Sequence, residues 1–311
     1  MSPGRDRLVV HADRPLAQRL EALAAARMVF FSGLPGTGKS LLVHQLAHLA
    51  AQVGRRVHLL QWDVARPAFE ASPAGQRYPL AGGVTHALIR KAAGLWARRA
   101  IAAWNEHHAD PRHLLVGETP FIGGRFVELA QRQDDAAESV LAAPSCRFAV
   151  AVPSVDVRRF LEAERERRAA RPLHARERED APPSVLRDLW RELAEVGVRM
   201  GIAAPGETGP TAQGLDWKGT AGGLTPYDPV LYRRVYEAVL RHRHVDVVAL
   251  HAILPTGALS VYDFAVAPPD LAPTPAEAEH EIREVEQRYP SLAAVERDVA
   301  SWWSVDRVSA L

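Results

Sequence analysis

The sequence predicts an α/β fold in which helices cover both faces of a mainly parallel central sheet of about five strands. Short apolar runs that suit buried parallel strands alternate with longer stretches whose apolar residues recur at helical spacing. The run at 28–32 is followed by a glycine-rich turn and a helical pattern. A second run at 56–62 then completes a strand–loop–helix–strand unit. These observations predict three layers, with the sheet in the middle.

The expected strands lie at residues 28–32, 56–62, 112–117, 146–152 and 245–250. The expected helices lie at residues 15–27, 40–53, 85–107, 155–171, 183–200 and 232–242. Residues 201–224 are rich in glycine, proline and threonine and are expected to form a loop. Two helical stretches follow a proline-rich break at 267–275. We therefore expect one domain over residues 1–266 and a C-terminal helical extension, 267–311, packed on that domain.

The composition is that of an ordinary globular chain. Of its 311 residues, 47% are hydrophobic and 24% charged, and the net charge is +1, which gives no global reason to expect a nucleic-acid or membrane partner. The one cysteine, Cys146, excludes an intrachain disulfide and is expected to be a buried structural thiol. Residues 1–10 lack the apolar core of a signal peptide, and no stretch has the apolar length of a membrane span. A cytoplasmic location is the expectation.

A glycine-rich segment follows the first expected strand. Residues 33–40 read Gly-Leu-Pro-Gly-Thr-Gly-Lys-Ser and fill every fixed position of the pattern G-x-x-x-x-G-K-[ST]. Glycines let successive backbone N–H groups turn toward phosphate oxygens, and the next helix adds its positive end. Lys39 is expected to reach the β- and γ-phosphates, and the Ser40 hydroxyl to bind Mg²⁺. The expected nucleotide-binding residues are Gly33, Leu34, Pro35, Gly36, Thr37, Gly38, Lys39, Ser40 and Leu41.

The use of lysine supports this interpretation. The chain contains abundant arginine but only three lysines, Lys39, Lys91 and Lys218. A lysine kept at position 39 in such a chain indicates a need for an ammonium group there. An ammonium is a compact charge, whereas arginine presents a planar fork.

The segment Val29–Leu42 resembles the P-loop NTPase superfamily, through its apolar strand, its complete glycine-lysine-serine pattern and its following helix. The resemblance implies a three-layer fold that binds ATP or another nucleoside triphosphate with Mg²⁺, and a reaction of phosphoryl transfer or hydrolysis. The motif covers a small part of the chain and does not separate kinases from ATPases or GTPases.

Such proteins need a second acidic group, to hold Mg²⁺ or to orient the nucleophile. Glu118 follows the expected strand at 112–117, and Asp63 follows the one at 56–62. Both are candidate catalytic residues, and Glu118 is also a candidate Mg²⁺ ligand beside Ser40. The usual aspartate directly after the apolar run is replaced here by Gly117-Glu118. Either carboxylate could instead be a solvated loop residue or a helix cap.

The layout beyond the motif is similar to that of P-loop small-molecule kinases. The chain has no Asn-Lys-x-Asp motif, which argues against a GTPase, and no adjacent Asp-Glu pair of the motor ATPase kind. Asp63 and Arg66 stand where such kinases contact the acceptor. An arginine-rich segment, 155–182, stands where their lid begins, and lid arginines neutralise charge on the transferring phosphate. Alternatively, these arginines pair with glutamates on a solvated helix. Arg125, close after Glu118, has no supporting motif.

Other polar clusters were weighed as sites. His44 and His48 are spaced as on a zinc-protease helix, but Gln45 replaces the glutamate that such a site needs. The histidines at 242, 244 and 251 are expected to be polar surface groups or groups near the nucleotide, rather than metal ligands. The helix at 85–107 carries Arg90, Lys91, Arg98 and Arg99 with two tryptophans. It could bind nucleic acid, but we favour a helix whose tryptophans anchor the core.

The leading hypothesis is an ATP-dependent kinase that transfers the γ-phosphate to a small-molecule acceptor. The rival is an ATPase that acts as a conformational switch for a protein or nucleic-acid partner. A third possibility is a nucleotide-binding module with little turnover.

Overall fold

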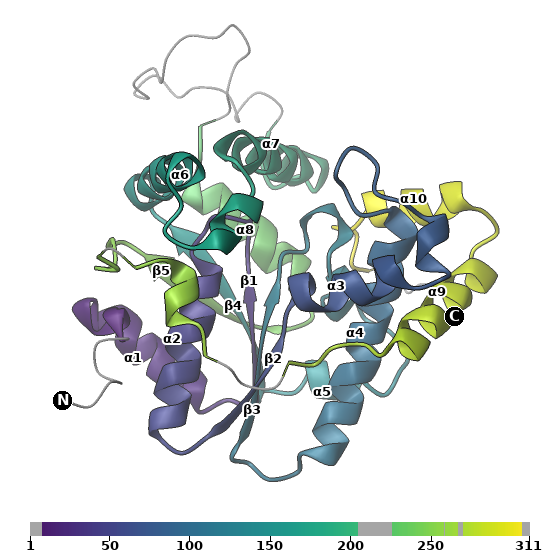
Figure 1. The fold of residues 1–311 in the computed structure, drawn as a ribbon, viewed down its shortest axis with the longest axis horizontal. Coiled ribbons are helices and arrows are strands. Elements are labelled where there is room, and N and C mark those ends of the chain that lie inside the picture. The colour runs from purple at the N-terminus through teal and green to yellow at the C-terminus, as the bar shows by residue number, and fades with distance from the viewer. Residues whose placement is uncertain (1–7, 205–225, 258, 267–269, 307–311) are drawn as a thin grey trace, which may run out of the picture.

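The computed structural model describes residues 8–204, 226–257, 259–266 and 270–306. A five-stranded sheet with the order β2-β3-β1-β4-β5 forms the centre of the molecule, and all of its neighbouring strands run parallel (Figure 1). The strands are β1 (Met28–Ser32), β2 (Arg56–Leu60), β3 (His113–Thr119), β4 (Cys146–Pro153) and β5 (His244–Leu250). The α/β class and the parallel sheet predicted from the sequence are confirmed.

Alternating residues of each strand face two separate cores, as the two-residue repeat of a strand requires. Phe30 and Leu115 belong to one core, and Val29 and Val116 belong to the other. Because both faces are covered, β1 is buried at every position.

Helices form a layer on each face of the sheet (Figure 1). α1 (Arg14–Ala24) and α2 (Lys39–Gln52) cover one face, together with the short η2 (Val9–Ala12). The other core takes residues from α3 (Trp62–Ala71), α4 (Ala87–His107), α5 (Glu138–Leu141), α7 (Pro183–Arg199), α8 (Pro229–Val239), α9 (Pro275–Arg288) and α10 (Leu292–Ala300). α6 (Val155–Ala170) lies beside α7 at one end of the sheet. The remaining short helices are η3 (Gly75–Arg77), η4 (Ile122–Gly124), η5 (Val127–Leu129), η6 (Ala175–Glu179) and η7 (Val261–Phe264).

One helix near the sheet was missed. The expected strand at 56–62 ends at Leu60, and Trp62 already begins α3. The apolar run continues through the strand end into Trp62, which buries its ring in the core, and Pro67 lies inside the helix. Because of these two features, the sequence pattern does not show where the strand ends and the helix begins. Asp63 therefore lies in the first turn of a helix, not in a loop after a strand.

The C-terminal segment packs on the main domain. Along its path the Leu271 amide donates to the Leu59 carbonyl over 2.7 Å, so the segment extends the β2 edge of the sheet before α9 begins. α9 then lies along α4 and α3, and α10 packs on α4. The covered edge presents fewer unpaired backbone groups to other chains.

The predicted loop at 201–224 falls largely outside the described residues, as do residues 1–7 and Lys218. Among the described helices, none has the length and apolar character needed to cross a membrane.

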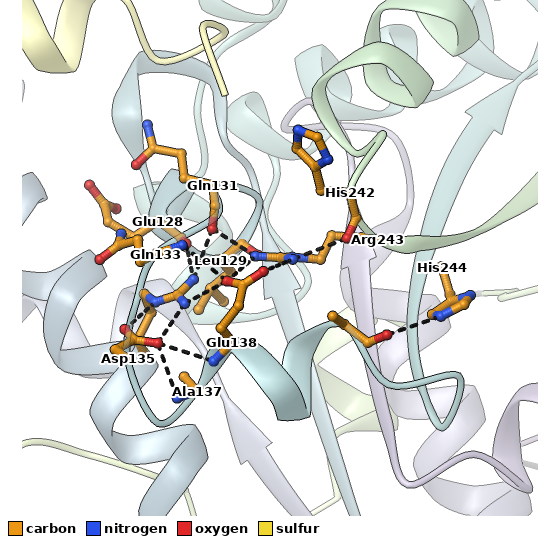
Figure 2. Close-up of polar contacts among 12 residues, drawn as sticks. Glu128, Leu129, Gln131, Gln133, Asp135, Ala137, Glu138, His242, Arg243 and His244 are labelled. Atoms are coloured by element: carbon orange, nitrogen blue, oxygen red, sulfur yellow. Dashed lines mark hydrogen bonds and ion pairs between the residues drawn. The ribbon is translucent and has the colours of Figure 1, made fainter. Parts of the chain in front are cut away.

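Two buried arginines fix the segment between β3 and β4 (Figure 2). Arg98 on α4 and Arg243 just before β5 have side chains that are 1% and 0% exposed. Both bind Glu138, and both donate to the Gln131 carbonyl, over 3.0 and 2.7 Å. Although burial opposes ionisation, the hydrogen bonds from the two arginines lower the pKa of Glu138 to about 2. This paired cluster, which we call the arginine lock (Arg98, Arg243, Glu138 and Asp135), is a structural element.

Candidate functional site

The glycine-rich loop, residues 33–40, connects the end of β1 to the start of α2. Gly36 and Gly38 have φ of 71° and 84°, a region that disfavours residues with a Cβ. At Gly36 a Cβ would also lie 2.6 Å from the Leu186 Cδ1 atom. Position 36 therefore needs glycine for two reasons, the turn itself and the close approach of α7, and position 38 needs it for the turn.

Three backbone amides of this loop have no acceptor in the part of the chain that the structure describes. The N–H groups of Gly36, Thr37 and Gly38 donate to no other described residue, and Gly38 caps α2 without a side-chain hydrogen bond. The first amides of α2 also have no partner within the helix, as at every helix start. A group of uncapped amides at a helix N-terminus is a binding site for an anion.

Lys39 lies under the loop. Its side chain is buried, and the Nζ atom donates to the Leu34 carbonyl over 2.7 Å but forms no ion pair with a described carboxylate. Burial lowers the pKa of Lys39 to about 8, and the more distant charge of Glu118 only partly opposes this. An ammonium held without a direct counter-ion attracts an anionic ligand.

Glu118 stands beside the loop because β3 is the neighbour of β1. In the register of this pair, Phe31 lies opposite Glu118, and Ser32 lies opposite Thr119 with 2.8 Å between the two hydroxyl oxygens. Burial raises the pKa of Glu118, while Lys39 and a hydrogen bond with Ser40 oppose the rise. The structure thus brings Lys39 and Ser40 of the loop close to Glu118 of β3, as the sequence predicted for these two distant segments.

Asp63 reaches the same place from α3. Its side chain is exposed, and its charge acts on Lys39, on Glu118 and on Arg125. Asp63 forms no ion pair with another described residue. Both carboxylates proposed from the sequence therefore contribute to one charged cluster around Lys39.

A strained turn carries Arg125 into this cluster. Phe121 and Phe126 adopt positive φ of 59° and 56°, which is unfavourable for bulky residues by about 1–3 kcal/mol each. Both rings are fully buried, Phe121 against Phe148 and Phe126 against Trp62. Core packing therefore holds the strained backbone on both sides of Arg125.

Arg125 and its neighbour Arg90 are cations that form no ion pair with any carboxylate among the described residues. Burial lowers the pKa of Arg125, and Asp63 opposes the shift from a distance. Arg90 donates from Nη1 to the Gly123 carbonyl, while its buried Nε atom has no partner among the described groups. Burial and the charge of Arg125 both lower the pKa of Arg90. No sequence motif marks Arg125 as a site residue. The turn held by Phe121 and Phe126 brings it to the site.

The arginine-rich segment contributes one side chain to the site. Arg158, in the first turns of α6, is buried, and its positive charge contributes to lowering the pKa of Lys39. It donates to Glu162 over 2.8 Å and to the Leu186 carbonyl over 3.0 Å, while its buried Nη1 has no partner among the described atoms. Arg165 and Arg168 instead pair with acidic residues of the same segment, Arg165 with Asp180 and Arg168 with Glu164 and Glu177.

Two residues that support the loop were not singled out from the sequence. The Tyr232 hydroxyl of α8 accepts a hydrogen bond from the Leu34 amide over 3.0 Å. Leu186 of α7 covers Gly36. Neither position has a local sequence signal, because each meets the loop only through the tertiary fold.

The alternative polar clusters take structural places. His48 bonds the Phe264 carbonyl over 3.0 Å, and burial lowers the pKa of His44 to about 4. His242 pairs with Asp306, and His244 with the Ala142 carbonyl, so their rings lie apart (Figure 2). Cys146 is buried, as expected, and burial raises the pKa of its thiol.

The basic helix predicted at 85–107 turns most of its charge inward. Lys91 binds Glu128 and Asp298, Arg98 belongs to the arginine lock, and both tryptophans of the helix are buried. Arg99 remains half-exposed and pairs with Glu281.

Comparisons of the chain with protein-family models, with curated proteins and with solved structures give no match. The chemistry of the site is therefore argued from its geometry. Uncapped amides and Lys39 suit a polyphosphate. The Ser40 hydroxyl and the Glu118 carboxylate are oxygen ligands of the kind that Mg²⁺ prefers. Arg125 and Arg158 add positive charge around the same point.

Proposed function

We propose that this chain binds ATP with Mg²⁺ through residues 33–41 and transfers the γ-phosphate to a small-molecule acceptor. The observation that carries the proposal is the cluster at the ends of β1 and β3. There, the amides of Gly36, Thr37 and Gly38 have no acceptor among the described residues, and the next residue, Lys39, is buried without an ion-pair partner among them, beside the two oxygen groups Ser40 and Glu118. Elsewhere in proteins, buried ammonium groups are paired, so a site that leaves one without a counter-ion at a helix N-terminus suits an anionic ligand.

Each residue has a definite task in such a reaction. The loop amides hold the phosphate chain in place, and the Lys39 ammonium donates to its terminal oxygens. Ser40 and Glu118 would hold Mg²⁺, which neutralises charge on the phosphates. Glu118 or Asp63 accepts the proton of the acceptor hydroxyl as that oxygen forms its bond to the γ-phosphorus. The bond between the γ-phosphorus and the bridging oxygen breaks, and ADP leaves with the electron pair.

The surroundings favour transfer over hydrolysis. α7 covers the loop through Leu186, and Arg158 ties α6 to α7 through the Leu186 carbonyl. A covered phosphate site excludes water and favours attack by a bound acceptor. The charge of Arg125 belongs to the same cluster, where it would stabilise the equatorial oxygens of the transferring group.

Labelled ATP tests the proposal directly. Full-length protein is incubated with Mg²⁺ and γ-labelled ATP, with and without pools of hydroxyl-bearing metabolites, and label is followed in product and in free phosphate. The kinase proposal expects label in one metabolite fraction and slow phosphate release without acceptor.

Phosphate release that responds to a protein or nucleic acid, with no labelled metabolite, would favour the switch ATPase. Binding of ATP without transfer or release would favour a nucleotide-binding module with little turnover.

A further inference from the structure

Three histidine rings meet at the end of the sheet opposite the glycine-rich loop. His58 comes from the middle of β2, His113 is the first residue of β3, and His108 is the C-cap of α4. Arg56 lies opposite His113 in the β2–β3 register, so His58 is two residues further along on the same face. α4 covers that face and delivers His108 to it. Fifty residues of chain separate His58 from His108, which explains why no sequence motif announces the group.

The rings are arranged as a closed triangle. Their centroids lie 4.4 Å apart for His58 and His108, 5.1 Å for His58 and His113, and 4.7 Å for His108 and His113. One ligand atom from each ring lies within 4.8 Å of the other two. In the part of the chain that the structure describes, this is the one group of three or more potential ligand residues that meets this criterion.

The hydrogen bonds place two ring nitrogens next to each other and fix the position of the proton on the third ring. His58 Nε2 and His113 Nδ1 are 2.8 Å apart, so one of them donates to the lone pair of the other, and a metal bound here requires that proton to move to the second nitrogen of its ring. His108 Nδ1 lies 3.0 Å from the Trp104 carbonyl, and a carbonyl only accepts, so this nitrogen carries the proton. The lone pair of His108 is then on Nε2. A ring fixed by such a backbone hydrogen bond has the orientation of a metal-bound histidine.

We propose that His58, His108 and His113 form a binding site for Zn²⁺, with water as the fourth ligand. In a tetrahedral site with Zn–N bonds of about 2.0–2.1 Å, neighbouring nitrogens are about 3.4 Å apart. For such a site the His58 and His113 nitrogens must move apart by about 0.6 Å. The His108 nitrogen, which lies within 4.8 Å of the other two, must move closer to them. His108 and His113 are half-buried, so water and ions have access to the group.

The ligand set determines the class of metal. Three imidazoles with no carboxylate suit Zn²⁺ and neighbouring late transition ions, whereas Mg²⁺ and Ca²⁺ prefer oxygen ligands. Arg27 adds a positive charge nearby, and it stacks on Trp104 at 4.4 Å while donating to the carbonyls of Asp110 and His113. The positive charge of Arg27 disfavours the binding of any metal cation. The site therefore favours metals whose bonds to imidazole are strong enough to offset this repulsion.

The site is independent of the proposed nucleotide site. His113 and Glu118 lie at opposite ends of β3, about 16 Å apart along the strand. A bound ion would join α4 to two strands of the sheet. We therefore assign it a stabilising role, not a part in the reaction.

The test is a zinc titration of metal-free, full-length protein in competition with a chromophoric chelator. The wild type is expected to bind one equivalent tightly, with a higher Tm in the presence of Zn²⁺. His108→Gln and His113→Gln are expected to weaken binding at least tenfold. The matched control is His107→Gln, because His107 is adjacent, exposed and bonded only to its own helix at the Ala103 carbonyl.

Co²⁺ gives a second readout, because tetrahedral nitrogen ligation produces a visible absorption band that loosely bound Co²⁺ lacks. The band is expected in the wild type and in His107→Gln, and is expected to be lost in His108→Gln. Circular dichroism shows that each variant is folded. Equal zinc affinity in the His107 and His108 variants, or no zinc bound by the wild type at micromolar free metal, would overturn the assignment.

Discussion

The molecule holds buried positive charge in two different ways. In the arginine lock, Arg98 and Arg243 each donate five hydrogen bonds, which use all five N–H groups of a guanidinium. At the glycine-rich loop, Lys39 bonds one backbone carbonyl, and Arg125 has no ion pair with a described residue. Both regions are deep in the fold, and both contain carboxylates nearby.

The difference separates structure from function. A saturated buried cation has nothing left to offer a ligand and serves to join segments distant in the sequence. An unsaturated one is unfavourable in the free protein, because desolvation is not offset. The burial-lowered pKa values of Lys39 and Arg125 express this imbalance. Such residues persist in a fold when a ligand completes them, which is why the loop and not the lock is the candidate site.

The largest expected effect comes from breaking the lock. Arg98→Met leaves carboxylates and carbonyls without donors, and removing one partner of a buried pair lowers the free energy of unfolding by about 3–5 kcal/mol. Urea unfolding measures this. Arg233→Met is the control, because its pair with Glu237 is exposed on both sides and is worth at most about 1 kcal/mol. Similar stabilities of the two variants would show that the lock is not a structural element.

Two buried lysines sharpen the comparison. Lys39→Met is expected to reduce phosphoryl transfer by about 10²–10³-fold, as for loss of one donor to a developing charge. Its free energy of unfolding should be unchanged or higher, because the ammonium has no direct counter-ion. Lys91→Met should lower the free energy of unfolding and leave the rate of transfer unchanged, since Lys91 pairs with Glu128 and Asp298. Steady-state rates and urea unfolding test both, and a destabilised Lys39→Met with normal rate would refute the contrast.

The two carboxylates of the site can be ranked. Glu118→Gln is expected to lower the rate about 10²-fold, the range for a lost acid–base group, with a smaller change in nucleotide affinity. Asp63→Asn is the matched change and should have the weaker effect, because Asp63 is exposed to solvent whereas Glu118 is half-buried. A larger effect of Asp63→Asn would move the catalytic role to Asp63. Normal rates in both variants would contradict the charged cluster as the reaction site.

The smallest expected effect is a pH dependence of nucleotide binding. Burial lowers the pKa of Lys39 to about 8 in the free protein, and a bound phosphate favours the ammonium and raises this pKa in the complex. Affinity for Mg-ATP should therefore be constant below about pH 8 and fall up to tenfold per unit above it. Calorimetry from pH 6.5 to about 9.5 measures this, and Lys39→Met should show no such fall. Affinity that rises with pH would refute the role of the ammonium.

Local patterns carried much of the fold. Residues 28–32 were predicted as a strand and match β1, because an apolar run followed by glycine is a signal contained within a few neighbouring residues. α3 was not predicted, because its local pattern is misleading. Trp62, where the helix begins, continues the apolar run of the preceding strand, and Pro67 interrupts the helical spacing. The strand order could not be read from the sequence, because it depends on which strands pair after folding.

The site shows the same division. The loop and Lys39 are contiguous, so a motif announces them, and Glu118 was nominated because strand ends commonly carry such groups. Arg125 depends on the buried rings of Phe121 and Phe126, and Tyr232 meets Leu34 across 198 residues. Contacts of this range leave no local trace. The arginine lock was missed likewise, because Arg243 and Glu138 are 105 residues apart.

The central claim is that the open amides and ammonium of the glycine-rich loop form a polyphosphate site. Calorimetric titration of folded, full-length protein with ATP and Mg²⁺ tests it most directly. The account predicts saturable heat with one nucleotide bound per chain, and weaker binding in Lys39→Met. No heat of binding with ATP or any other Mg-nucleoside triphosphate, in a sample that melts cooperatively, would contradict it.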